Sequence, residues 1–535
     1  MRTPNESMKK YLAKRILLSV LSLLIVVMVV MFLVYTGIER SVIFQMDDMW
    51  NKKALNDKTY YEYKQYQKYG YLTYVDYTTF VAEKYKAIYG DEYSKQSEFV
   101  TDIAAIQNSE HYRENGTVEE FIQSYGHQNG TKIKYMAPQK FKSGKVKPGG
   151  GAYLIAVTER NVFFRMLDYV KNFFSVETTQ MVQDDTLTDR YIRMEKDPYS
   201  GMPAVIGSGT HHKYLLYFDG RFPFIHQNFI HMNLGVSYTT YRDQEINEVI
   251  NNPVTGELLV TKQQYPALIG TDRYDETAVN FHTATYNANS SESEIAEFGD
   301  KYTVCTYRRG GLSMIENSFV MGIISTILAY LIGLPLGISM ARHKDSLGDT
   351  LGNAFIIFIT AVPSLAYIFM FAALGTTLFH LPYKFANAEV KTMAYILPII
   401  SLAMPQITSL MKWMRRYMID QMNSDYVKFA RAEGLSEQEI YKIHISRNAL
   451  IPLVHGIPAS ILGCLTGAVI TERVYSVPGV GNLLTNAINS HDNGIIIACT
   501  VFYTALSLVS LILGDLLLAK YDPRITLTDE GGGGR

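Results

Sequence analysis

Six apolar stretches, each long enough to cross a lipid bilayer as a helix, constrain this sequence more than any other feature. About 20 predominantly apolar residues are enough to span the hydrocarbon core of a membrane as a helix. The predicted spans are residues 16–36, 318–341, 351–378, 393–411, 450–470 and 495–518. The chain is therefore predicted to be an all-α polytopic membrane protein with six transmembrane helices.

A polar block separates the first span from the other five. Residues 41–309 contain no apolar span and are rich in Tyr, Asn, Lys, Asp and Gly, so the overall figure of 47% hydrophobic residues averages two unlike kinds of segment. The block is long enough to bury its own core, and we expect an inserted α+β domain. Within residues 161–176, apolar side chains recur at helical spacing. That amphipathic face either belongs to the domain core or lies on the membrane surface.

Basic residues in the short loops predict the orientation of the chain. Lys and Arg collect in residues 1–15, in "ARHK", in "KWMRR" and in residues 424–448, whereas residues 475–494 contain neither. Because Lys and Arg accumulate on the cytoplasmic side, both termini are predicted to be cytoplasmic and residues 41–309 extracellular. The first span is too long for a signal peptide and no small-residue cleavage pattern follows it, so we interpret it as a retained helix.

The polar segment 424–448 carries signals for two short helices although it lies between predicted spans. Residues 425–433 suit a helix, and Gly434 can adopt the left-handed conformation that ends one. Ser436 and Glu439 then form a capping box that begins the next helix. A solvated linker is the alternative interpretation, but linkers between adjacent helices are usually much shorter. We predict a cytoplasmic helix–turn–helix centred on Gly434.

This hairpin also carries a resemblance to a known family. The sequence "DYVKFARAEGL", followed by "RNALIPLV", resembles the EAA box of ABC-importer permeases, in the form used by the oligopeptide, dipeptide and nickel branch. The general family pattern has Glu-Ala-Ala before the glycine, where this chain has Lys428, Phe429 and Ala430. That departure is normal for the peptide branch. "IGLPLGISMAR", "TERVYSVPGVGNLL" and "DPRI" resemble the same branch.

A second resemblance lies in the polar block. Residues 207–235 resemble the enlarged extracellular region of the AmiC-type, OppB-like permeases of streptococci and related Gram-positive bacteria. The resemblance implies an ABC-importer type I permease fold, with residues 318–518 as the permease core and residues 519–535 as a cytoplasmic tail. The function implied is that of the permease subunit of an ATP-driven oligopeptide importer.

The resemblance further implies partners and a coupling site. A second homologous, OppC-like permease, OppD-like and OppF-like ATP-binding subunits and an OppA-like extracellular lipoprotein would complete the importer. ATP and Mg²⁺ would bind the ATP-binding subunits, since this chain lacks the G-x-x-x-x-G-K-S/T pattern; we expect no cofactor and no enzymatic activity in it. The turn would dock on an ATP-binding subunit through Asp425, Ala430, Arg431, Ala432, Glu433, Gly434, Leu435 and Ser436.

Two further sets of residues are candidates for roles in the membrane. The outer candidates are Glu472, Pro478, Gly479 and Gly481. They suit a gate-like turn or part of the pathway, because irregular backbone is tolerated beside a water-filled cavity, although an ordinary loop is the alternative. Glu472 either snorkels to water or lines the pathway.

Small residues also allow close helix packing. We favour this packing role over a direct substrate role for Gly333, Pro335 and Gly337.

Other readings of the sequence remain open. The histidines of the polar block lack the spacing and the acidic or cysteine companions of a metal site, so no metal is expected at His211, His212, His226 or His231. A peptide-sensing membrane receptor is one alternative function, although Pro and Gly within several spans favour transport. A permease for nickel or another small solute is another.

Overall fold

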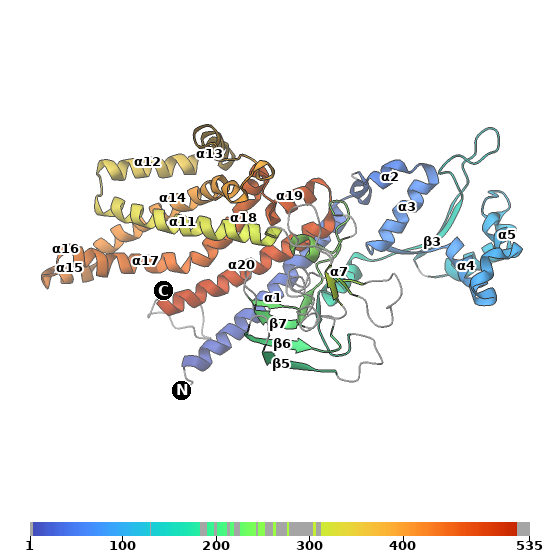
Figure 1. Cartoon of the computed structure of the whole chain (residues 1–535), viewed down its shortest axis with the longest axis horizontal. Coiled ribbons are helices and arrows are strands. Elements are labelled where there is room, and N and C mark those ends of the chain that lie inside the picture. Colours follow the sequence, from blue (N-terminus) through green and yellow to red (C-terminus); the bar gives the residue numbers. More distant parts are fainter. Residues whose placement is uncertain are drawn as a thin grey trace.

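The computed structural model is elongated, with a helical bundle at one end, α2 to α5 (residues 48–105) with β3 (Tyr153–Glu159) at the other, and β5 to β7 (within residues 192–218) near the middle (Figure 1). The first helix and the last lie side by side along the bundle. The structure describes residues 4–45, 47–128, 130–181, 190–196, 201–210, 214–218, 225–241, 244–251, 261–263, 275–277, 303–305 and 312–521.

Five helices among these residues are long and apolar enough to cross a membrane. The predicted first, second and last spans correspond closely to helices, and all but the first three residues of the predicted fourth lie in a longer helix that also contains "KWMRR". The five helices are α1 (Pro4–Gly37), α11 (Met314–Arg342), α14 (Ile396–Met422), α18 (Ile457–Tyr475) and α20 (Asn493–Tyr521).

The predicted third span, residues 351–378, is wrong as a single helix. The chain forms α12 (Leu347–Ala361) and α13 (Ser364–Phe379), which meet at 112° and make a sixth span only if the bent pair counts as one. Proline causes the break, because Pro363 has no N–H to donate and disfavours helical geometry in the residue before it. Val362 is accordingly extended, with φ −77° and ψ 130°.

The predicted fifth span, residues 450–470, has the wrong boundaries. A separate helix, α17 (Ser446–His455), ends at Gly456, and the membrane-crossing helix α18 begins just after it. Pro458 lies in the first turn of α18, where its missing N–H costs no helical hydrogen bond. Proline at that position therefore favours a helix start inside the predicted span.

Close backbone contact joins α11 to α14 at the centre of the bundle. A Cβ atom on Gly333 would lie 2.9 Å from the Ile407 carbonyl oxygen, and one on Gly337 would lie 2.9 Å from the Met411 carbonyl oxygen. Only glycine fits at these distances, which is the geometry that the packing interpretation of these two residues requires. Pro335 lies inside α11 between them.

An ion pair joins the near ends of α12 and α14. Asp349, with a side chain only 3% exposed, accepts two hydrogen bonds of 2.7 Å from the Arg415 guanidinium. The two parallel bonds hold the carboxylate and guanidinium in one geometry. The start of the bent pair is thereby fixed to the bundle.

The polar block contains short helices and antiparallel strands. Its largest described sheets are β1-β3-β2 and β5-β6-β7-β8, and β4 pairs with β9, as β10 does with β11 and β12. The helices are α2 (Asp48–Lys52), α3 (Leu55–Lys68), α4 (Tyr77–Tyr89), α5 (Ser97–Ala105), α6 (Gly116–Gly126), α7 (Val162–Lys171) and α8 (Ile246–Asn251). The strands are β1 (Leu72–Asp76), β2 (Thr131–Met136), β3 (Tyr153–Glu159), β4 (Phe174–Val176), β5 (Ile192–Lys196), β6 (Pro203–Gly207), β7 (Tyr214–Phe218), β8 (Ile225–Gln227), β9 (Ile230–Met232), β10 (Thr261–Gln263), β11 (Asp275–Thr277) and β12 (Thr303–Cys305).

The predicted amphipathic segment, residues 161–176, divides its apolar face between core and surface. Met166 and Phe173 are buried, so the core interpretation is right for them. Phe163, Leu167 and Phe174 are exposed, and for these the core interpretation is wrong. The helix itself ends at Lys171, so Phe174 belongs to β4 instead.

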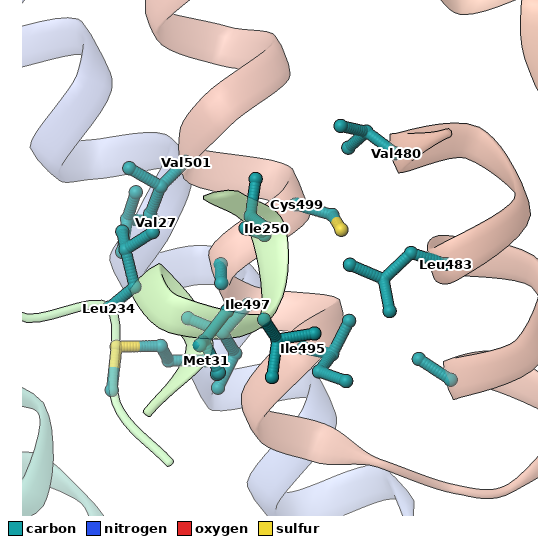
Figure 2. Close-up of a cluster of buried hydrophobic side chains, with 14 of the residues drawn as sticks. Val27, Met31, Leu234, Ile250, Val480, Leu483, Ile495, Ile497, Cys499 and Val501 are labelled. Carbon is teal, nitrogen blue, oxygen red and sulfur yellow. The ribbon is translucent and has the colours of Figure 1, made fainter. Parts of the chain in front are cut away.

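A shared hydrophobic core joins the polar block to the bundle. Leu234 and Ile250 of the block pack with Val27 of α1 and with Ile497 of α20 (Figure 2). Leu483, from the helix that precedes α20, completes this core on the opposite side. The block is therefore packed against three helices of the bundle as well as being tethered at its ends.

A buried carboxylate organises the start of the polar block. Asp47 accepts hydrogen bonds from the Tyr238 hydroxyl at 2.7 Å, from the Tyr61 hydroxyl at 2.8 Å and from the Met49 and Trp50 amides. Burial raises the pKa of this carboxyl, but the hydrogen bonds outweigh burial and leave the pKa below its usual value. Asp47 therefore ties α2 and α3 to the residues just before α8.

Candidate functional site

The predicted helical hairpin is present at the far end of the bundle (Figure 1). Helix α15 (Asp425–Ala432) ends beside Gly434, whose φ of 82° is left-handed, as predicted. The predicted capping box is also confirmed, because the Ser436 hydroxyl accepts from the Glu439 amide while the Glu439 carboxylate accepts from the Ser436 amide. A short helix, α16 (Glu437–Glu439), follows and runs through residues 440–445 into α17.

One face of this hairpin packs against α14. Val427, Ala430 and Ile440 are buried in the same hydrophobic core as Met414 and Met418 of α14. Because Ala430 is only 5% exposed, its side chain supports the hairpin from inside instead of presenting a surface to a partner. The apolar residues thus fix the hairpin to a membrane-crossing helix, so a movement of one would be passed to the other.

The opposite face of the hairpin is exposed and holds most of the predicted coupling residues. Arg431 crosses the turn to Glu437, with Nε 2.7 Å from Oε1, and this ion pair closes the hairpin on its surface side. The Arg431 hydrogen bond lowers the pKa of the Glu437 carboxyl. Leu435 is half-buried, and the exposed members of the predicted set are Asp425, Arg431, Ala432, Glu433, Gly434 and Ser436.

Phe429 is a surface feature that the sequence reasoning did not single out. Its side chain, in the middle of α15, is 70% exposed, although a large apolar group at that position costs free energy in water. The helical spacing could have revealed it, since Phe429 precedes the buried Ala430 by one position and must point away from α14. An exposed aromatic beside an exposed turn is suited to a protein contact.

The outer candidates form a buried turn at the opposite end of the bundle. Glu472 is fully buried, so the snorkelling interpretation is wrong. Its carboxylate accepts from the Ser318 hydroxyl at 2.7 Å and from the Asn482 amide at 2.9 Å. Asn482 lies in the first turn of α19 (Val480–Asn489), where a carboxylate satisfies free amides and complements the helix dipole. Residues 480–489 are thus helical and not an ordinary loop.

The two glycines of this turn make room for the carboxylate. A Cβ atom on Gly481 would lie 3.0 Å from Glu472 Oε2, and one on Gly479 would overlap the same carboxylate. Pro478 is held from α11, because its carbonyl oxygen accepts from Asn317 Nδ2 at 2.7 Å. The four outer candidates therefore form one packed joint between α11, α18 and α19.

A cavity lies among α13, α14 and α18. Its volume is about 310 Å³, and Glu472 does not line it, although the preceding Thr471 does. The side chain of Gln406 in α14 forms part of the cavity wall. Its buried Oε1 atom has no hydrogen-bond partner among the described residues. Apolar side chains such as Ile368, Leu402 and Ile470 share the lining with hydroxyl-bearing residues from the same three helices, namely Ser364, Tyr367, Ser401, Ser409, Ser460 and Thr471.

A second joint ties the polar block to the start of α20. Asp492 is fully buried, and its Oδ2 atom accepts a 2.7 Å hydrogen bond from the Ser237 hydroxyl. The same oxygen accepts from three successive backbone amides, at 3.1 Å, 3.2 Å and 3.1 Å, while Oδ1 caps α20. The three amides belong to Tyr238, Thr239 and Thr240.

Replacing Asp492 by Asn is expected to loosen this joint. An amide NH₂ group in place of either oxygen loses acceptors for buried donors, which costs about 2 kcal/mol. The thermal unfolding midpoint of the purified complex should fall by several degrees, and proteolysis between the block and α20 should become faster. Asp91→Asn is the matched control, because the Asp91 side chain is 96% exposed. Equal midpoints for the two variants would contradict this account of the joint.

Some predicted features lie outside the described residues. These are His211 and His212, "DPRI" and the tail beyond residue 521. His226 and His231 lie in β8 and β9, but their side chains are outside the description. In the part of the chain that is described, no three His, Cys, Asp or Glu side chains group as metal ligands would.

Membrane-crossing helices packed around a cavity, with an exposed hairpin fixed to one of them, are the architecture expected of a multi-pass helical permease. The chain belongs to the family described as "Binding-protein-dependent transport system inner membrane component", whose profile matches residues 333–527. It is 34% identical to the oligopeptide transport system permease protein AmiC of Streptococcus pneumoniae serotype 4, over 98% of this chain and 100% of that protein. The resemblance to AmiC-type permeases is thereby confirmed.

Other relatives match a smaller part of this chain. The dipeptide transport system permease protein DppB of Lactococcus lactis subsp. cremoris is 32% identical over 39% of this chain and 69% of its own length. Among solved structures, inward-facing conformations of the MetNI methionine ABC transporter are 12% identical, with a TM-score of 0.33, over 39% of this chain and 94% of that chain. Family membership thus supports a helical ABC-importer permease fold with five or six apolar helices.

Proposed function

We propose that this chain is the permease subunit of an ATP-driven oligopeptide importer and forms half of its translocation pathway. The observation that carries the proposal is the 34% identity to AmiC over 98% of the chain. In that assembly, an OppC-like permease would form the other half of the pathway. OppD-like and OppF-like subunits would bind ATP and Mg²⁺, and an OppA-like lipoprotein would deliver the peptide.

The proposed orientation has the termini and the hairpin in the cytoplasm and residues 41–309 outside. Tyr11 donates to Asp515 at 3.1 Å, and Arg15 lies 3.3 Å from the same carboxylate, so the start of α1 and the end of α20 share one end of the molecule. The hairpin is at that end too (Figure 1). Basic residues favour the cytoplasmic side, and they gather here.

The hairpin is the proposed contact with an ATP-binding subunit. Exposed Phe429 and the exposed turn at Gly434 offer an apolar anchor and a rigid projection. The buried face of the hairpin is fixed to α14, so closure of the ATP-binding subunits would pull on a membrane-crossing helix directly. That is the requirement for alternating access by rigid-body motion.

The polar block is the proposed docking site for the peptide-binding lipoprotein. The sheet β1-β3-β2 with α4 to α6 stands at the end of the molecule farthest from the hairpin (Figure 1). Asp76 at the end of β1 pairs with Ile155 in β3, so residues 77–152 can be replaced by a short Gly-Ser linker that joins the two strands. This deletion keeps α7 and the joints to α1 and α20.

The deletion of residues 77–152 is expected to weaken binding of the lipoprotein and to reduce peptide uptake. Co-purification of the ATP-binding subunits should stay unchanged, because their proposed contact is at the other end. Surface plasmon resonance with the purified complex measures binding of the lipoprotein, a proteoliposome assay measures peptide uptake, and pull-down measures association with the ATP-binding subunits. Unchanged affinity and uptake would mean that this region is a stabilising cap without a docking role.

Uptake by proteoliposomes tests the proposed function as a whole. Liposomes that hold the full assembly should accumulate labelled oligopeptides only with internal ATP and external binding protein. A parallel assay with Ni²⁺ distinguishes the cargo. ATP-dependent nickel uptake without peptide uptake would show that the peptide assignment is wrong, whereas uptake of neither would contradict the importer assignment.

A further inference from the structure

A second cavity lies where the polar block meets the ends of α1 and α20. Its volume is about 340 Å³. Tyr35 from α1, Tyr71 before β1 and Asn493 at the start of α20 form part of its wall, and α7 supplies Arg165 and Tyr169. The cavity is therefore built by several segments that are far apart in the sequence and that neither the hairpin nor the outer joint uses.

Arg165 is a buried cation, and the carboxylate of Asp168, which also lines this cavity, is paired with Arg160 instead. The residue is only 7% exposed, and its guanidinium lies between the rings of Tyr35 and Tyr71, 3.8 Å from each ring centroid. Among the described residues, no carboxylate lies within 4.0 Å of that guanidinium. Two aromatic faces recover only part of the free energy lost when a charge leaves water. The charge of Arg165 is therefore not balanced by an ion pair, which favours an anionic ligand.

Two buried polar atoms beside Arg165 also lack partners within the described chain. They are the Tyr169 hydroxyl and Asn493 Oδ1. The Asn493 amide nitrogen is engaged, since Nδ2 donates to the Tyr71 hydroxyl at 3.1 Å. A ligand that fits must therefore offer acceptors to the guanidinium and the tyrosine hydroxyl, and a donor to the amide oxygen. A phosphate diester with a hydroxyl-bearing headgroup offers all three.

The cavity lies at the level of a membrane surface. Tyr35 is two residues from the end of the apolar span of α1, and Asn493 begins the span of α20. Phe32, one turn below Tyr35, is 52% exposed, so an acyl chain can lie along α1. Phe163 and Phe164 beside Arg165 are 58% and 62% exposed, as expected of an amphipathic helix that lies in the membrane interface.

We propose that this cavity binds the headgroup of an anionic phospholipid, with Arg165 as the contact to its phosphate. The exposed phenylalanines of α7 then rest among the lipids, while Tyr169 and Asn493 bind the phosphate and the headgroup hydroxyl. The bound lipid fastens α7, and with it the polar block, to the bundle. The site belongs to the outer leaflet under the orientation proposed above, but lipid binding itself requires no transport.

Lipid binding to the purified, delipidated assembly tests the proposal. Native mass spectrometry should show about tenfold preference for dioleoylphosphatidylglycerol over dioleoylphosphatidylcholine, because both carry the phosphate but choline adds a positive charge near Arg165 and has no hydroxyl to donate to Asn493 Oδ1. Arg165→Gln should remove the preference, and Arg165→Lys should restore part of it. Arg113→Gln is the matched control, because Arg113 is an exposed arginine whose described side-chain contacts are with Tyr112 alone. It should keep the full preference.

A measurement on the unchanged protein covers the case in which Arg165→Gln does not assemble. A photoactivatable phosphatidylglycerol should cross-link to α7 or to the end of α1, and soluble glycerol phosphate should not compete with it. Competition by glycerol phosphate would identify a free-phosphate site and overturn the lipid assignment. Equal binding of the two lipids, or a preference that survives in Arg165→Gln, would overturn the proposal as well.

Discussion

Replacing Gly434 by Val is expected to reduce ATP-driven uptake about thirtyfold, because a left-handed backbone costs a β-branched residue about 2 kcal/mol. The φ of 82° at Gly434 is in the region that side chains disfavour, whereas an added Cβ would meet no atom within 4 Å. The penalty therefore arises from the backbone alone. Reconstituted transport and pull-down of the ATP-binding subunits measure the loss, since the altered turn should also dock less well.

Gly434→Asn is the matched control for this turn. Asparagine adopts the left-handed region more readily than other side chains do, and the open space around Gly434 accommodates it. We expect Gly434→Asn to retain most of the uptake. If both variants lost transport equally, the docking surface would require a residue without a side chain at position 434. If Gly434→Val transported normally, the coupling role proposed for this turn would be wrong.

Replacing Glu472 by Ala is expected to destabilise the outer joint by about 3 kcal/mol, through unpaired buried donors and the cavity left behind. The Ser318 hydroxyl and the Asn482 amide lose their common acceptor, and α19 loses the carboxylate at its first turn. The purified complex should unfold at a lower temperature, and its yield should fall. Thermal unfolding monitored by intrinsic fluorescence measures the change.

Two further variants separate the causes of that loss. Glu472→Gln keeps the volume and one acceptor, so about half of the destabilisation should remain. Gly479→Ala places a Cβ in the position of the carboxylate and should destabilise the joint although Glu472 is intact. Glu389→Ala, at an exposed glutamate of the same bundle, is the control and should behave as the native protein does. A Glu472→Ala complex as stable as this control would contradict the structural role.

The hairpin is the part of the site that sequence reasoning predicted in detail. Its signals act within a few residues: a glycine ends α15, and Ser436 and Glu439 are three positions apart. The exposure of Phe429 follows from the same local helical spacing, but the resemblance to the family does not by itself predict it. The bend at Pro363 is equally local, although apolar composition alone predicts an unbroken span.

The sequence by itself determined the apolar spans and the helix–turn–helix, because apolar composition and helix capping depend on residues that are neighbours along the chain. Only the tertiary structure decided that Glu472 is a buried joint and that Asp492 fastens the polar block to α20. Their hydrogen-bond partners, Ser318 and Ser237, lie 154 and 255 positions away. No local pattern specifies such partners, since the same carboxylate could face water, a pathway or a helix end until packing brings the distant segments together.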